Sequence, residues 1–323
     1  MVISRTPFRI SFIGGGSDLP SFYQQQQGGV ISTTINKYVY ITTNPRFDES
    51  LRISYAKTEI VNSVNEIQHP LFRETLREVN IDSGIEVTSV ADIPSGTGLG
   101  SSSAFCVGLL NALHAHRGRY TSAQQLAEKA CHLEIDVLKE PIGKQDQFAS
   151  AYGGLRRYLF NPDGTVFNDP IICPSERQRD FFDHIMLFYL GGSRTASSVL
   201  GVTNPDTAHL MRLRALVDAF WAILTGTQDL RRLGEVLHEG WENKKLMGGV
   251  TNSVIDELYA VARRAGALGG KLLGAGQTGF LMLFVEPKNK LAVKEALWYT
   301  LYNPREVEFG FEPEGSKIIY YGN

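Results

Sequence analysis

Polar and apolar residues alternate with the period of a β-strand in the first third of the chain. The stretch Ile85-Glu86-Val87-Thr88-Ser89-Val90 is the clearest case, because every second side chain of a half-buried strand faces the core. Three further stretches are rich in β-branched and aromatic residues and are bounded by glycine, proline, asparagine or aspartate. They cover residues 9–13, 29–43 and 51–55.

Helical spacing follows after residue 100. Residues 102–116 are apolar almost all round, which predicts a helix buried on every side. The next helix begins at the capping sequence Thr121-Ser122-Ala123-Gln124 and stops before Pro141. Its apolar stripe predicts one buried face.

The second half mixes strands with longer helical segments. We expect strands at 185–190, at 280–285 and near Val307 and Ile318, and helices at 206–224, 229–245, 253–265 and 288–301. Strands before and after blocks of helices predict an α+β fold in both halves. A chain of 323 residues exceeds the usual size of one core. We therefore predict two domains, residues 1–180 and 181–323.

Composition narrows the class of protein. Hydrophobic residues make up 43% of the chain, enough for a real core. The 32 Lys and Arg nearly balance the 34 Asp and Glu, which disfavours a dedicated nucleic-acid binder. The apolar stretches fall short of the about 20 residues that span a bilayer, and the three cysteines form no CxxC pair. We expect a cytoplasmic protein without a nucleic-acid or membrane partner.

The most informative stretch is Pro94-Ser95-Gly96-Thr97-Gly98-Leu99-Gly100-Ser101-Ser102-Ser103-Ala104. Glycines at every second position let the backbone approach an anion closely, and the loop leads into a helix start, which favours phosphate. The serine hydroxyls could bind phosphate oxygens or a divalent cation. A flexible turn with a serine cap is the alternative. The sequence contains no GxxxxGK[ST] loop and no HRD or DFG triplet of a protein kinase.

A second glycine motif, at residues 274–279, formally matches GxGxxG. A dinucleotide-binding fingerprint needs a strand before the glycines and a helix after them. A strand follows here instead, at 280–285. We therefore expect a loop that closes over a site, or a plain hairpin turn.

Three carboxylates are candidates for chemistry. Asp146 is flanked by amides, so it could stay ionised and accept or orient the proton of a substrate hydroxyl, although a solvated helix cap explains it too. Glu134 lies on a partly apolar helix face and calls for a partner or a metal, unless it pairs with a surface lysine. Asp18 fits a helix cap before Pro20. Arg9 shares a strand face with Ser11.

The three glycine-bearing segments, in this order, resemble those of the GHMP kinases. PFRISFIGGGSD at 7–18, PSGTGLGSSSA at 94–104 and GAGQTGF at 274–280 match the three motifs of that superfamily. Many members carry Gly-Glu-His where this chain has Gly14-Gly15-Gly16, which points away from galactose and mevalonate. GGGSDLPSFY, GKQDQFAS at 143–150 and GGSRTAS at 191–197 look most like the heptose 7-phosphate kinases.

The resemblance implies a fold and a reaction. The fold would pair an N-terminal ribosomal-protein-S5-like α+β domain with a C-terminal ferredoxin-like domain, and the active site would lie in the cleft between them. The reaction would be ATP- and Mg²⁺-dependent phosphorylation of the anomeric hydroxyl of D-glycero-D-manno-heptose 7-phosphate. A kinase for fucose or a uronic acid, and a non-catalytic nucleotide sensor on the same fold, remain alternatives. The resemblance leaves room for a homodimer.

It also implies roles for individual residues. Asp146 would be the catalytic aspartate, with Arg9 beside it, and Ser102 and Glu134 would bind Mg²⁺. The nucleotide phosphates would contact Pro94, Gly96, Gly98, Leu99, Gly100, Ser101, Ser102 and Ser103. The substrate would contact Gly15, Gly16, Ser17, Asp18, Arg194, Gly276 and Thr278. Arg194 is the candidate for the phosphate of the sugar, and Lys37, Lys244 and Lys271 compete for that role.

Overall fold

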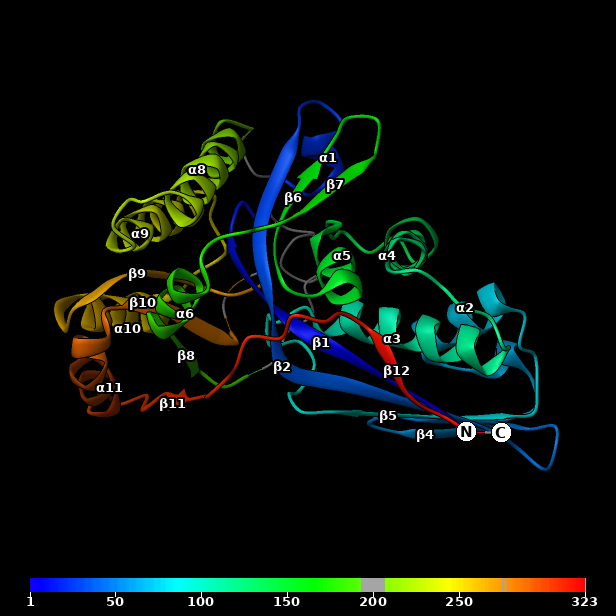
Figure 1. Cartoon of the computed structure of the whole chain (residues 1–323). Helices are drawn as coiled ribbons and strands as arrows, with labels where there is room; N and C mark the ends of the chain where they lie inside the picture. Colours follow the sequence, from blue (N-terminus) through cyan, green and yellow to red (C-terminus); the bar gives the residue numbers. More distant parts are fainter. Residues whose placement is uncertain (193–206, 275, 277, 323) are drawn as a thin grey trace.

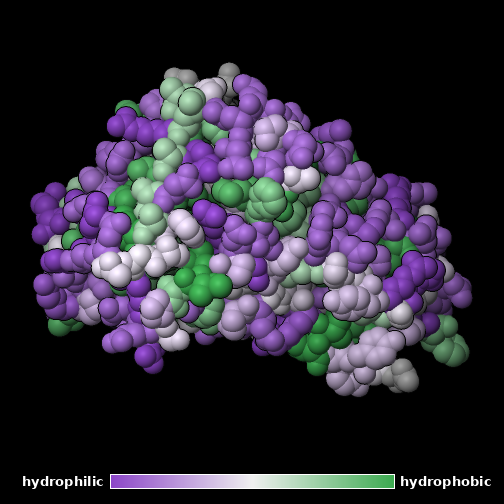
Figure 2. Space-filling model, turned by 45° about the horizontal axis from the view of Figure 1, so that its top comes forward, coloured by the Kyte–Doolittle hydropathy of each residue, from purple (hydrophilic) through white to green (hydrophobic). Residues whose placement is uncertain are grey.

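The computed structural model describes residues 1–192, 207–274, 276 and 278–322. Two mixed layers of helix and sheet, one in each half of the chain, confirm the predicted α+β fold (Figure 1). Arg194, predicted to bind the phosphate of the sugar, lies outside the described residues. The face seen in Figure 2 is largely hydrophilic, with apolar side chains in small separate groups.

The first sheet has the strand order β12-β1-β2-β5-β3-β4, and β6 pairs with both β2 and β7. Its long central strands include the stretches expected from the β-branched pattern. The strands are β1 (Val2–Ile13), β2 (Gly28–Pro45), β3 (Leu51–Ser54), β4 (Thr58–Val61), β5 (Ile85–Ala91), β6 (Leu155–Phe160), β7 (Val166–Pro170) and β12 (Lys317–Tyr321).

Helices cover this sheet on the side seen at the upper right of Figure 1. The central one, α3 (Ser101–His116), lies against β1 and β2 and is buried along most of its length, as predicted. Its apolar residues have to face the sheet on one side and neighbouring helices on the other. Those neighbours are α2 (Pro70–Val79), α4 (Ala123–Cys131) and α5 (Gln145–Tyr152), and the short α1 (Pro20–Tyr23) and the 3-10 turn Val64–Glu66 complete this half.

The prediction of one α-helix through residue 140 is wrong in its second part. The α-helix α4 begins at a capping box of Ser122 and Gln125, one residue after the predicted box of Thr121 and Gln124, and it ends at Cys131. Residues His132–Val137 then form a π-helix that contains Glu134. The wider π turn shifts the phase of the side chains by one residue, and such turns often occur at functional sites.

The second sheet has the order β11-β8-β10-β9, with every pair antiparallel. Its strands are β8 (Ile185–Tyr189), β9 (Ala267–Leu272), β10 (Phe280–Val285) and β11 (Arg305–Glu306). Its helices are α6 (Ser175–Asp183), α8 (Thr207–Thr225), α9 (Arg231–Leu246), α10 (Ser253–Arg264) and α11 (Lys290–Trp298), and a 3-10 turn covers Pro287–Asn289.

The two halves are joined by apolar packing and by the returning end of the chain. Helix α8 lies against β1 and β2, where Phe220 stacks on Phe12 with ring centroids 5.8 Å apart. Strand β12 pairs antiparallel with β1, so both ends of the chain lie side by side (Figure 1). The boundary between residues 180 and 181 stays a prediction, but β12 belongs to the sheet of the first half.

Candidate active site

A cavity of about 980 Å³ lies where the first glycine segment, the loop before α3 and the β9–β10 loop meet. This volume is typical of a site for a nucleotide or another small molecule. Both halves of the chain contribute to its wall, as the resemblance to the GHMP kinases implied for the active site.

The loop before α3 has the geometry expected for holding phosphate. Gly96, Gly98 and Gly100 have φ values of +74°, +90° and +73°, which favour glycine. No side chain caps the first turn of α3, so its leading N–H groups and the helix dipole favour an anion. The cavity wall includes Pro94, Gly96, Gly98, Gly100, Ser101, Ser102 and Ser103. Leu99, also predicted to contact nucleotide, is buried, and its carbonyl accepts a hydrogen bond from the backbone of Arg9.

Asp146 and Arg9 form a two-point ion pair beside this loop. Nε and Nη2 of Arg9 each donate to one carboxylate oxygen of Asp146 over 2.7 Å, and Nη1 donates to the Gly98 carbonyl over 2.7 Å. A Cβ added to Gly100 would lie only 3.3 Å from Oδ2 of Asp146. The side chain of Arg9 is 5% exposed and that of Asp146 is 23% exposed. The carboxylate is therefore fixed by Arg9 while it stays open to the cavity.

Glu134 comes from the π-helix and reaches the first turn of α3. Its oxygens accept hydrogen bonds from Oγ of Ser102 over 2.9 Å and from Nε2 of Gln147 over 2.7 Å. Burial, with the negative charge of Asp146, raises the pKa of Glu134 to about 7, against the hydrogen bonds of Ser103, Ser102 and Gln147. A buried carboxylate with only neutral partners favours a cation beside it. The sequence analysis did not predict that Gln147 bonds Glu134, because no local sequence pattern indicates this contact.

Asp18 lies on the same cavity. It is buried, and its carboxylate accepts from the backbone N–H of Gly16 over 2.8 Å and of Gln145 over 3.3 Å. Burial and the nearby charge of Asp146 raise its pKa. A Cβ on Gly143 would fall 1.9 Å from Oδ2 of Asp18, so the chain can pass here only as glycine.

The other predicted substrate contacts divide into two groups. Gly15, Gly16, Gly276 and Thr278 line the cavity. Ser17 does not, since its hydroxyl lies in the core, where its one hydrogen is shared between the carbonyls of Gly14 and Gly29 at 2.8 and 2.9 Å.

The β9–β10 loop is not a dinucleotide-binding motif. Strands β9 and β10 pair antiparallel on either side of it, as the strand expected after the glycines implied. Among its described glycines, a Cβ on Gly274 would lie 2.5 Å from Cα of Gly98, and one on Gly279 would lie 2.2 Å from the Thr97 oxygen. The third motif therefore packs backbone to backbone on the phosphate loop.

One end of the cavity was not predicted. Its wall there is aromatic and apolar, formed by Tyr55, His69, Leu71, Ile93 and Phe105. Burial lowers the pKa of His69, so this end favours a flat neutral group. Scattered single residues give no sequence pattern from which it could have been found.

Comparison with models of known protein families shows to which family the chain belongs. The family model of the GHMP kinases N terminal domain matches residues 62–154, and that of the GHMP kinases C terminal matches residues 219–299. The chain belongs to the GHMP kinases.

Two proteins similar to this kinase over most of its length are named as sugar kinases. This kinase is 26% identical to a D-glycero-alpha-D-manno-heptose 7-phosphate kinase of Campylobacter jejuni, with 91% of this chain and 92% of that protein covered. An L-fucokinase/L-fucose-1-P guanylyltransferase of Bacteroides fragilis is 25% identical, with 98% of this chain but 38% of that protein covered. The present GHMP kinase is thus an ATP-dependent phosphotransferase that acts on a sugar.

Solved structures bear out the fold. A crystal structure of a D-glycero-D-manno-heptose 1-phosphate kinase from Bacteroides thetaiotaomicron superposes over the whole of both chains with a TM-score of 0.83 and 24% identity. At that identity the likeness concerns the fold alone. Among the described residues of the present kinase, no helix is both long and apolar enough to traverse a lipid bilayer.

Proposed function

We propose that this kinase phosphorylates the anomeric hydroxyl of D-glycero-D-manno-heptose 7-phosphate and yields the 1,7-bisphosphate. The observation that carries the proposal is the Arg9–Asp146 pair, which opens into the cavity shared by the glycine loop and Asp18. The heptose 7-phosphate kinase from Campylobacter jejuni, similar over nearly the whole length, supports this substrate.

In this mechanism Asp146 orients the acceptor and takes its proton. Both carboxylate oxygens accept hydrogen bonds from Arg9, and each keeps a further lone pair for the C1 hydroxyl. As the C1 oxygen forms its bond to the γ-phosphorus, the bond from that phosphorus to the β–γ bridging oxygen breaks and ADP leaves. The hydroxyl proton passes to Asp146. Positioning and electrostatics supply most of the acceleration.

The triphosphate would lie on the loop and the start of α3. The backbone N–H groups there are fixed before the reaction, so they stabilise the charge that moves to the leaving oxygen without rearranging. Nη1 of Arg9 donates a hydrogen bond to the Gly98 carbonyl. This bond fixes the position of the Arg9–Asp146 pair relative to the same loop.

Ser102 and Glu134 fit a magnesium site. Both supply oxygen, which Mg²⁺ prefers, and the buried carboxylate of Glu134 accepts hydrogen bonds from the neutral side chains of Ser102 and Gln147. No cluster of three or more His, Cys, Asp or Glu side chains suited to a metal occurs in the described part of the chain, so phosphate oxygens and water would complete the ligands. When bound, Mg²⁺ would neutralise phosphate charge.

The sugar would lie between Asp146 and the first glycine segment. Asp18 can accept hydrogen bonds from sugar hydroxyls, while the backbone at Gly15 and Gly16 and the side chain of Thr278 border the same space. Arg194 stays a proposed ligand of the sugar phosphate from its sequence position.

A kinase for an unphosphorylated sugar is the second candidate. The similarity to the Bacteroides fragilis fucokinase covers 98% of this chain and favours it.

A substrate panel separates the two candidates. ADP release would be measured with D-glycero-D-manno-heptose 7-phosphate, the unphosphorylated heptose, L-fucose and D-galacturonate, with ATP hydrolysis without sugar as the blank. We expect a kcat/KM at least about a hundredfold larger for the heptose 7-phosphate, because a site built to pair a charged group rejects analogues that lack it. The ³¹P NMR spectrum of the product should show a second, anomeric phosphate. Preference for fucose or galacturonate would contradict the proposal.

A further inference from the structure

Lys271 is a lysine that is buried beside the cavity. It lies on β9, and the residue is only 7% exposed. Its Nζ makes no hydrogen bond or ion pair within the part of the chain that the structure describes. Burial, together with the positive charges of Lys244 and Arg9, lowers its pKa well below the usual value. Burying the charged form of such a group costs free energy unless an anion lies beside it.

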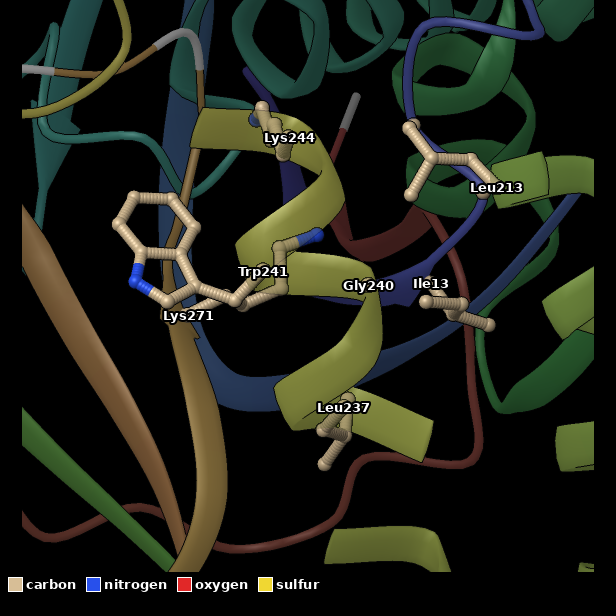
Figure 3. A pocket seen from close by; sticks show the side chains of 9 residues that line it. Ile13, Leu213, Leu237, Gly240, Trp241, Lys244 and Lys271 are labelled. Carbon is tan, nitrogen blue, oxygen red and sulfur yellow. The ribbon is translucent and has the colours of Figure 1, made fainter. Parts of the chain in front are cut away.

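Lys244 stands beside it on another element. It extends from α9, is half-buried, and donates from Nζ to the Gly274 carbonyl over 2.9 Å. Burial and the charge of Arg9 lower its pKa to about 8. Figure 3 shows Lys244 and Trp241 on α9 with Lys271 next to them. Both lysines line the large cavity and a small recess beside Gly14 and Gly15.

We propose that Lys271 and Lys244 bind a phosphate monoester that the acceptor sugar carries away from the hydroxyl to be phosphorylated. This inference rests on the proposed function, which makes the acceptor a sugar phosphate. Two ammonium groups match the two negative charges of a phosphate, whereas a uronic acid offers one.

The position of the lysines favours the acceptor over ATP. Asp18, proposed to bind the sugar, is close enough to influence the charge of both lysines, and Gly15 lines both spaces with them. The triphosphate is already proposed to bind at the loop before α3 and at the start of α3. Lys271 lines the recess and the large cavity together with Gly15, which is proposed to contact the sugar.

Methionine variants test the lysines with little change of shape. Lys271→Met and Lys244→Met remove the charge and keep the length of the side chain. Lys245→Met is the matched control, since Lys245 lies on the same helix and pairs with Glu242 over 2.7 Å. We expect each test variant to lower the ratio of kcat/KM for the heptose 7-phosphate to kcat/KM for the unphosphorylated heptose by at least about tenfold. A rise of the KM for ATP with an unchanged ratio would assign the lysines to the nucleotide and overturn the inference.

Binding without turnover separates this inference from the proposed function. Calorimetric titration of inorganic phosphate and of heptose 7-phosphate would use protein saturated with Mg²⁺ and AMP-PNP, so that the nucleotide phosphates are already in place. We expect the Kd of both probes to rise at least about tenfold in Lys271→Met and to stay at the wild-type value in Lys245→Met. If that holds but heptose 7-phosphate is not turned over, the substrate assignment fails and the phosphate site stands. If turnover occurs and neither lysine affects binding, the phosphate site fails.

Discussion

Glu134 combines deep burial with three neutral hydrogen-bond donors, which has a consequence for stability. Its pKa of about 7 in the folded protein lies above the ordinary 4.5, so the folded state holds more protons than the unfolded chain between these values. Stability therefore falls as pH rises from about 4.5 to about 7. At about 1.4 kcal/mol per pKa unit, the loss amounts to about 3 kcal/mol.

Substituting Glu134→Gln should remove this loss. The Gln147 amide, whose Oε1 has no partner, would turn to accept from the new amide, and its own Nε2 then loses the Glu134 acceptor at every pH. We expect the free energy of unfolding of the variant relative to wild type, both without Mg²⁺, to rise by about 3 kcal/mol between pH 5 and pH 8. Urea unfolding in EDTA measures this, with the exposed Glu128→Gln as control. Parallel pH profiles of wild type and Glu134→Gln would contradict the buried charge.

At the scale of elements, the close contact between the phosphate loop and the β9–β10 loop decides the shape of the site. Gly98 has a φ of +90°, and a Cβ there would lie 2.4 Å from the carbonyl oxygen of Leu273. Its own carbonyl holds Arg9. Any side chain at this position must push the two loops apart.

We therefore expect Gly98→Ala to cost about 2 kcal/mol or more of stability and to weaken ATP binding. Gly118 is the matched control, because its φ is +67° and a Cβ there would have no neighbour within 4 Å. Gly118→Ala should cost about 1 kcal/mol, from the backbone conformation alone, and leave ATP binding unchanged. Denaturant unfolding and nucleotide titration measure both effects. Equal losses in the two variants would show that the loops do not restrict position 98.

Elements with a strong local period could be predicted from the sequence. The buried helix α3 and the capped start of α4 are of this kind. Helix α2 was missed although it begins with Pro70 at its N-terminus and ends at Asn80 in a left-handed conformation, both ordinary signals. The π turn around Glu134 had no local signal, since its glutamate bonds Ser102 of α3, 32 positions earlier in the chain.

At the scale of the whole molecule, the site depends on contacts that no local pattern specifies. Arg9 and Asp146 are 137 positions apart, and only the resemblance to a family suggested that they meet. The roles of the loop before α3 and of the carboxylates beside it were likewise inferred from the family motifs. The motifs gave no indication of the aromatic end of the cavity. They also left open whether Arg194 or one of the two lysines binds the phosphate of the sugar. The homodimer for which the resemblance leaves room stays a prediction.

The most direct test of the central claim is the turnover of Asp146→Asn, with ATP affinity measured on the same protein. The amide keeps the shape of the side chain but cannot accept the proton, so kcat should fall about a thousandfold while the Kd for ATP stays close to wild type. Asp169→Asn removes a carboxylate from another arginine pair, at Arg157, and should leave kcat unchanged. Turnover of Asp146→Asn at the wild-type rate would contradict the claim that this carboxylate and the glycine loop form one phosphoryl-transfer site.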